Sequence, residues 1–112
     1  MPVSQNDIQE MIQTIRDRIV ERFQPERIIL FGSHARGDAG PDSDVDILVV
    51  LNINGSKRQK AIEIGTALHD IPVAKDILVS TPEEYEWRKE VTGTIEYPAS
   101  HEGVVLYAKE LS

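Results

Sequence analysis

Two strand-like runs that flank one loop constrain the fold more than any other feature of the chain. The runs, Ile28 to Phe31 and Val45 to Leu51, are continuous, apolar and rich in β-branched residues, which is typical of buried β-strands. Glycine, proline, aspartate and serine crowd the residues between them, and these residue types favour turns and loops. The segment 28–50 therefore predicts two strands, with polar side chains gathered where the strands meet the loop.

Asp44 and Asp46 stand one residue apart at the start of the second run. Side chains alternate along a strand, so both carboxylates leave the same face, with Cα atoms roughly 6.5–7 Å apart. Two carboxylates this close repel each other, which raises the pKa of at least one, and a divalent cation removes that repulsion. The chain has no cysteine, and an oxygen-only ligand set suits Mg²⁺ or Mn²⁺ better than Zn²⁺. Alone, such a pair is most often a solvated strand end, so its weight depends on the residues around it.

Gly32 and Ser33 follow the first run directly. Gly32 leaves room for a ligand to approach the backbone, and we expect Ser33 to cap a short helical turn whose free N–H groups point at a phosphate. Arg36 either anchors the loop by hydrogen bonding or contacts a triphosphate, which its planar guanidinium suits. Ser43 either orients the Asp44 carboxylate or touches a phosphate. The loop therefore predicts a phosphate-binding turn beside the carboxylate pair.

Together, Gly32-Ser33, Arg36-Gly37 and Ser43-Asp44-Val45-Asp46 resemble the motif of the nucleotidyltransferase superfamily that includes DNA polymerase β. The short chain, the form G-S-x-A-R-G and the ending Glu102-Gly-Val-Val-Leu-Tyr107 resemble the minimal nucleotidyltransferase (MNT) group, often encoded beside a HEPN-domain partner. The resemblance implies an α+β fold of the polymerase β-like type, with a central mixed β-sheet flanked by helices. His34 occupies the position that the motif leaves variable, so we assign it no catalytic role.

Asp76 interrupts the next apolar run, Val73 to Val79. A helical crossover usually makes the strands on either side of it parallel and often adjacent. Neighbouring strands lie about 4.8 Å apart, so Asp76 reaches the face of Asp44 and Asp46 if the register permits. Its position and type match the superfamily's third carboxylate, which the resemblance implies binds one metal ion and helps to deprotonate the acceptor hydroxyl. The alternative is an aspartate that pairs with Lys75 or is exposed at a sheet edge.

Helical patterns account for most of the remaining chain. Apolar residues recur at helical spacing from Ile8 to Phe23, and Ser4 with Asp7 has capping-box spacing. Thr81-Pro82-Glu83-Glu84 combines a cap, a first-turn proline and a capping-box glutamate. We expect helices over residues 5–23, 57–70, 82–91 and 95–101, and a last short strand over residues 104–107.

Length and charge limit the classes of protein that the chain can represent. With 112 residues, about 40% of them hydrophobic, residues 1–112 are expected to form a single domain. The formal net charge of −7 disfavours an extended nucleic-acid surface. With no signal peptide and no apolar run of membrane-spanning length, we expect a cytoplasmic protein that does not enter a membrane.

Lys57, Arg58 and Lys60 cluster in the first turn of a predicted helix. Cations there oppose the helix dipole, so their position needs a reason from outside the helix, although a solvated face is the simpler interpretation.

Two classes of function fit these residues. In the favoured hypothesis, Asp44, Asp46 and Asp76 hold two Mg²⁺ ions roughly 3.5–4 Å apart, while Gly32, Ser33 and Arg36 hold the β- and γ-phosphates of the nucleotide. The resemblance implies ATP as the donor and AMP transfer to a hydroxyl of a HEPN ribonuclease toxin, which the chain neutralises as an antitoxin; a small molecule is the alternative acceptor. In the second hypothesis, the chain is a non-catalytic binding module that masks its partner.

A macromolecular acceptor needs an apolar docking patch on this acidic chain. Tyr85, Trp87 and Tyr97 are candidates for it, although packing in the core is the simpler use of aromatic side chains. The sequence leaves a homo-oligomer open.

Overall fold

Five helices and four strands make up the part of the chain that the computed structural model describes, residues 5–40 and 42–109. In chain order they are α1 (Gln5–Phe23), β1 (Arg27–Phe31), α2 (Ser33–Arg36), β2 (Val45–Val50), α3 (Lys57–Ala67), β3 (Lys75–Ser80), α4 (Pro82–Arg88), α5 (Glu96–Glu102) and β4 (Val104–Ala108). None of the helices within these ranges is long and apolar enough to cross a bilayer.

The strands form one mixed sheet in the order β3-β2-β1-β4. β1 pairs antiparallel with both β2 and β4. β2 and β3 run parallel, because α3 carries the chain back from the end of β2 to the start of β3. The expected α+β fold with a mixed sheet is confirmed, as is the expectation that the strands around the helical crossover are parallel neighbours.

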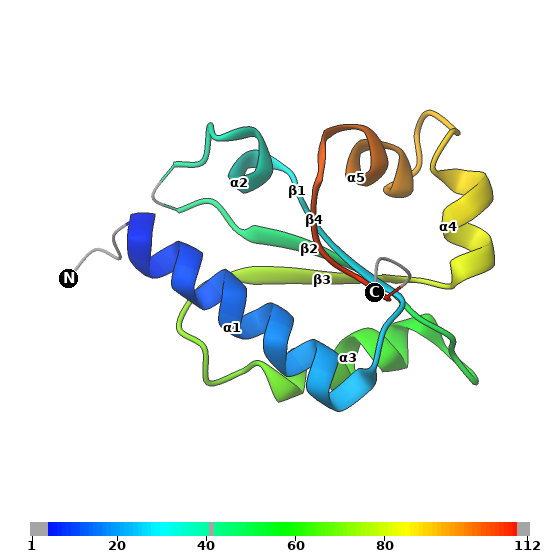
Figure 1. Ribbon diagram of the computed structural model, residues 1–112, viewed down its shortest axis with the longest axis horizontal. Helices are drawn as coiled ribbons and strands as arrows, with labels where there is room; N and C mark the ends of the chain where they lie inside the picture. Colours follow the sequence, from blue (N-terminus) through cyan, green and yellow to red (C-terminus); the bar gives the residue numbers. More distant parts are fainter. Residues whose placement is uncertain (1–4, 41, 110–112) are drawn as a thin grey trace.

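Helices cover the sheet on both faces (Figure 1). Alternate residues of β2 point to opposite faces. One set packs with α1 and α3 in a cluster of buried aliphatic side chains that includes Ile15, Ile19, Ile47, Ile64 and Leu68. The other set packs with α4 and α5 in a smaller cluster of Ile29, Phe31, Leu48, Val50, Tyr85 and Ala99. Because β2 is apolar on both faces, its central position in the sheet follows from its sequence.

The helix starts agree with the sequence better than the helix ends. Ser56 caps α3 by accepting a hydrogen bond from the Gln59 N–H (3.2 Å), and Thr81 with Glu84 forms the expected capping box of α4. The expected cap of α1 at Ser4 lies outside the described residues. α3 ends at Ala67 rather than at residue 70, and α4 ends at Arg88 rather than at residue 91, because helix ends lack sharp sequence signals here.

Candidate functional site

Asp46 and Asp76 occupy directly opposite positions on the paired strands β2 and β3. Asp46 lies two residues before Leu48, and Asp76 lies two residues before Leu78. Leu48 and Leu78 pack toward α4 and α5. Side chains two residues apart on a strand lie on the same face, so both carboxylates share that face of the sheet. Asp44 lies directly before β2 and is exposed. The register that the sequence left conditional therefore places Asp46 and Asp76 side by side on one face, and Asp44 lies near enough for its charge to act on Asp46.

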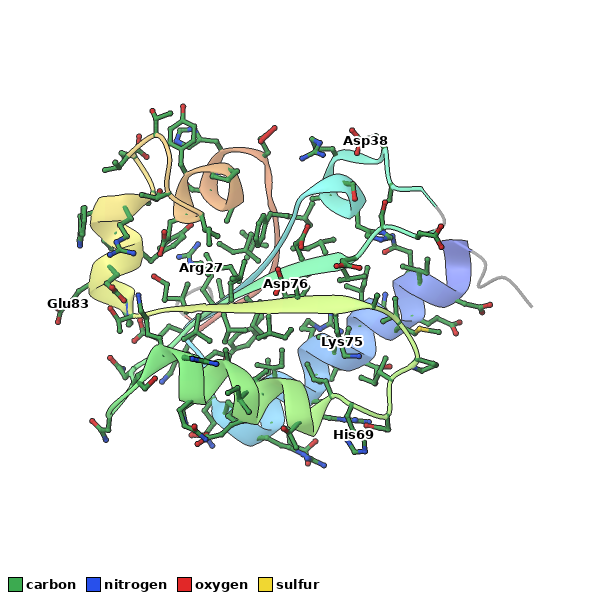
Figure 2. All side chains as sticks on the ribbon, turned by 180° about the vertical axis from the view of Figure 1, so that it is seen from behind. Arg27, Asp38, His69, Lys75, Asp76 and Glu83 are labelled. Carbon is green, nitrogen blue, oxygen red and sulfur yellow. The ribbon has the colours of Figure 1, made fainter. Side chains whose placement is uncertain are left out.

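The sequence left two places open for Asp76, beside the other two carboxylates or exposed at a sheet edge, and the structure shows both. Asp76 lies beside Asp46 and is exposed, on a strand at the edge of the described sheet. Lys75 does not pair with it, because the Lys75 ammonium donates to the carbonyls of Ile71 (2.8 Å) and Val73 (3.0 Å). Figure 2 shows Lys75 and Asp76 on opposite sides of β3. The ion-pair alternative for Asp76 is therefore wrong.

Asp46 is the carboxylate of the site whose ionisation is disfavoured in the folded protein. Burial raises the pKa of Asp46 above its ordinary value of 3.8, and the negative charges of Asp76 and Asp44 raise it further. The positive fields of His34 and Arg36 offset part of that rise. A convergent carboxylate cluster of this kind is stabilised by a cation, so its electrostatics fit a metal ion.

The side-chain positions do not form a closed protein cage for such an ion. Within residues 5–40 and 42–109, no three His, Asp or Glu side chains stand close enough together to hold a metal by themselves. Mg²⁺ is commonly held by one or two carboxylates, with water and substrate phosphate oxygens as the remaining ligands. An open pair or trio of aspartates is therefore the ligand set that suits Mg²⁺ together with a nucleotide.

Gly32 packs against the carboxylate of Asp46. A Cβ built on Gly32 would meet Asp46 Oδ2, and the backbone φ of Gly32 is +76°, in the region that side chains disfavour. Gly32, rather than the expected Ser33, is the N-cap residue of α2, and no side chain caps this helix. Its carbonyl accepts from the N–H groups of Ala35 (3.1 Å) and Arg36 (3.0 Å). The earlier N–H groups of the turn, including that of Ser33, have no acceptor within the helix, and their binding of a phosphate stays a prediction.

Replacing Gly32 with alanine is expected to displace the Asp46 carboxylate and weaken Mg·ATP binding by about tenfold or more, the scale of losing one well-placed ligand. Gly37 provides a matched control. It has φ +86°, but a Cβ there meets nothing within 4 Å. Gly37→Ala should therefore lose similar stability through backbone strain, about 1 kcal/mol, and retain Mg·ATP affinity. Calorimetric titration of both variants with Mg·ATP measures the difference. Equal Mg·ATP affinity in Gly32→Ala and Gly37→Ala would refute a role of the contact between Gly32 and Asp46 in nucleotide binding.

Two short-range side-chain hydrogen bonds stabilise the described part of the loop that follows α2. The Arg36 Nε–H donates to Asp38 Oδ2 (3.3 Å), which fits the loop-anchoring interpretation of Arg36. The Gly40 N–H donates to Ser43 Oγ (2.9 Å), so this hydroxyl closes a turn in the described structure. Arg36 is exposed, and its positive field acts on Asp46; its triphosphate-binding alternative stays a prediction, as do both alternatives for Ser43.

His34 is the site residue that sequence reasoning set aside. Its side chain is buried, and its Nε2–H donates to the carbonyl of Ser43 (3.1 Å). Ser43 directly precedes Asp44, so this bond ties α2 to the backbone that carries the first carboxylate. The burial of His34 depends on how the loop folds back over α2, and the variable motif position gives no signal of it.

The prediction of an exposed docking patch from Tyr85, Trp87 and Tyr97 is only partly correct. Tyr85 is buried in the core, and Tyr97 stacks on His101 with ring centroids 4.2 Å apart. Trp87 is 59% exposed and, with the exposed Val91 and Ile95, lines a groove of about 510 Å³. Leu48 and Leu78 also line this groove, which therefore opens on the same face of the sheet as the carboxylates.

The Asp46 carboxylate has a consequence for stability that is independent of catalysis. Because the pKa of Asp46 is raised in the folded protein, its ionisation destabilises the fold once the pH exceeds the ordinary aspartate pKa of 3.8. Asp46→Asn is therefore expected to raise the melting temperature of the nucleotide-free protein by a few degrees at pH 7, with the gain vanishing below about pH 4. Thermal melts over this pH range, with exposed Asp42→Asn as control, measure it. A lower melting temperature at pH 7 would contradict the assigned electrostatics.

Comparison with known proteins bears on the family and the fold of this chain. The family model described as a nucleotidyltransferase domain matches residues 12–100. The chain is 44% identical over 43 residues to the protein adenylyltransferase MntA of Thermococcus cleftensis, a match that covers 38% of this chain and 43% of that protein. The chain spans about half of the length of the curated relatives that it matches, from 43% to 54% of three of them.

Two crystal structures share the fold. One, described as a "putative nucleotidyltransferase from Sulfolobus solfataricus", has a TM-score of 0.64 at 22% identity and covers 90% of this chain and 80% of its own. The other, a toxin–antitoxin with AMP-PNP, has a TM-score of 0.52 at 19% identity and covers 92% of this chain and 74% of its own. Since the family model spans most of the chain and includes the loop and all three carboxylates, the chain belongs to the nucleotidyltransferase domain family.

Proposed function

We propose that this chain transfers AMP from ATP to a hydroxyl group of a partner protein, a HEPN-domain ribonuclease that it neutralises as an antitoxin. The observation that carries the catalytic part is the direct pairing of Asp46 with Asp76, with Asp44 near enough for its charge to act on Asp46. The name of the MntA relative and the toxin–antitoxin structure with an ATP analogue support the donor and the kind of partner.

Each site residue has a role in the proposed reaction. The backbone turn at Gly32 and Ser33, with Arg36, binds the β- and γ-phosphates and fixes the α-phosphorus in line for attack. Asp44 and Asp46, with Asp76, would hold Mg²⁺, which when bound stabilises the charge that develops on the α-phosphate and lowers the pKa of the attacking hydroxyl. Asp76 accepts the hydroxyl proton as the acceptor oxygen bonds to the α-phosphorus, and the bond from that phosphorus to the bridging oxygen breaks to release pyrophosphate.

The acceptor has to reach an exposed site on a small domain. Asp44 and Asp76 are both exposed, and the groove beside Trp87 opens on the same face. A groove lined by exposed apolar side chains suits contact with another protein better than contact with a polar small molecule. This favours a macromolecule as the acceptor.

Incubation with the HEPN partner, Mg²⁺ and ATP labelled at the α-phosphate tests the proposal. The label should appear on one hydroxyl-bearing residue of the partner, located by mass spectrometry, whereas ATP labelled at the γ-phosphate should leave the partner unlabelled because pyrophosphate departs. Label on a small molecule or RNA would refute the protein acceptor. An unlabelled partner that is nevertheless inhibited would favour the non-catalytic binding module.

A further inference from the structure

A second groove, of about 450 Å³, lies between α3 and β3. Apolar side chains line its middle, among them Ile62, Val73 and Ile77, and Ile62 is 52% exposed. This groove is separate from the groove beside Trp87, because Ile77 and Val73 pack toward α1 and α3, on the face opposite the carboxylates.

The outer edge of β3 forms one wall of this groove. The carbonyls of Ala74 and Ser80 accept from the N–H groups of Val45 (2.9 Å) and Leu51 (3.1 Å), so they face β2. Backbone groups of successive strand residues point to opposite sides. The N–H and C=O groups of Lys75, Ile77 and Val79 therefore point away from β2, and no strand within the described ranges pairs with that side of β3. The edge can accept one more strand.

Cations stand at both ends of the groove. α3 begins near the end of the sheet where β2 and β3 end, and it finishes near the start of β3. Arg58 therefore lies at one end of the groove, and His69 and Lys75 lie at the other. Figure 2 shows Lys75 and His69 on the same side of β3. The nearby carboxylates of Glu63 and Asp70 are paired with Lys60 and Arg18. On a chain of net charge −7, this groove is lined by three basic residues and no acidic one.

Arg58 is the member of the basic cluster that internal contacts do not explain. The Lys57 ammonium lies 2.9 Å from Glu84 Oε2, and the Lys60 ammonium lies 2.9 Å from Glu63 Oε2. Arg58 lines the groove instead. A cation in the first turn of a helix opposes the helix dipole, and the guanidinium of Arg58 is exposed in the groove, where it is available to an anionic group.

Gly65 keeps the groove open at its centre. A Cβ added to Gly65 would meet nothing within 4 Å, so close packing inside the fold does not require a glycine. Glycine inside a helix is less favourable than alanine by a measurable amount. Gly65 therefore leaves space in the groove that a side chain of a bound ligand can fill.

We propose that the groove between α3 and the outer edge of β3 binds an extended, acidic segment of another protein, which joins the sheet as a strand alongside β3. Alternate side chains of the segment enter the groove, with an apolar one over Gly65 and Ile62. One carboxylate meets Arg58, and another accepts the third N–H of the Lys75 ammonium, whose other two N–H groups donate to backbone carbonyls of this chain. A second copy of this chain fits less well, because pairing two β3 edges brings the basic ends of both grooves together. Since β3 also carries Asp76, a partner held here lies within reach of the carboxylates.

Peptide binding without ATP tests this proposal independently of nucleotidyl transfer. The probe is a labelled peptide, acetyl-Glu-Thr-Ile-Thr-Glu-amide, whose pattern is the same in both strand directions, and the control peptide has lysine in place of glutamate. The acidic peptide should bind, more weakly as salt concentration rises, and the basic one should not. In hydrogen exchange, the peptide should slow the amides of Lys75, Ile77 and Val79, while those of Asp76 and Leu78 stay unchanged.

Two surface substitutions test the two parts of the proposal separately, the space over Gly65 and the positive charge of Arg58. Gly65→Leu fills the groove and should stabilise α3 while reducing peptide affinity by about tenfold or more. Arg58→Glu should reduce it by about fivefold, whereas the same charge change at exposed Arg22 on α1 should have no effect. Undetectable binding of the acidic peptide, full affinity in Gly65→Leu, or binding without slowed exchange at the three outward amides would each overturn the proposal. A dimer in sedimentation that persists with peptide present would assign the groove to a second copy instead.

Discussion

Asp44→Asn and Asp46→Asn are each expected to reduce nucleotidyl transfer to the partner by at least about a thousandfold, equivalent to about 4 kcal/mol of transition-state stabilisation. Asp46 stands opposite Asp76, and its pKa is raised by burial first and then by the negative charges of Asp76 and Asp44. An asparagine keeps the shape but removes the charge that holds a divalent cation. Mg·ATP affinity should fall in parallel, and in the wild-type protein it should also fall on acidification, beginning at a higher pH than for an ordinary aspartate.

Single-turnover transfer of the α-phosphate label measures this loss, with Asp42→Asn as the control. Asp42 is also an exposed aspartate of the same segment, but it lies two residues before Asp44 and has no place in the proposed ligand set. The same variants separate the enzyme from the binding module. If they fold, bind the partner and still neutralise it, the transfer reaction is not the means of neutralisation. If transfer is unchanged in either variant, the proposed metal site is wrong.

Asp76→Asn is expected to slow transfer by at least about a hundredfold while leaving Mg·ATP affinity largely intact. Asp76 lies on the edge strand, is exposed, and stands opposite Asp46. This position suits a group that receives the acceptor's proton better than a group that holds the triphosphate. Loss of a general base lowers the rate of the chemical step and spares ground-state binding of the nucleotide.

The pH dependence gives this assignment a second readout. If the acceptor is a tyrosine, its hydroxyl ionises without help as the pH approaches about 10. The deficit of Asp76→Asn relative to wild type should then narrow as the pH rises. A folded variant with unchanged transfer, or one whose deficit lies wholly in Mg·ATP affinity, would leave Asp76 as a structural residue or a nucleotide ligand.

The sequence determined the elements and the local placement of the site. Period-two spacing predicted that Asp44 and Asp46 share one face, because side-chain alternation within a strand needs no information from elsewhere. The two apolar runs matched β1 and β2, and Thr81 with Glu84 matched the capping box of α4, since caps depend on residues within one turn. The loop residues between the runs carried the resemblance to the nucleotidyltransferases, to which the chain belongs.

Only the tertiary structure decided which distant residues meet. The pairing of Asp46 with Asp76 depends on the register of two strands that α3 separates, and register is set by how the helix packs rather than by either strand alone. The contact of Gly32 with the Asp46 carboxylate, the burial of His34 and the burial of Tyr85 beside exposed Trp87 have the same origin. Each depends on segments that lie apart in the chain and are brought together when the apolar faces of the sheet are buried. The hydrophobic effect acts between apolar groups whatever their separation in the sequence, so the sequence pattern alone does not tell which segments meet.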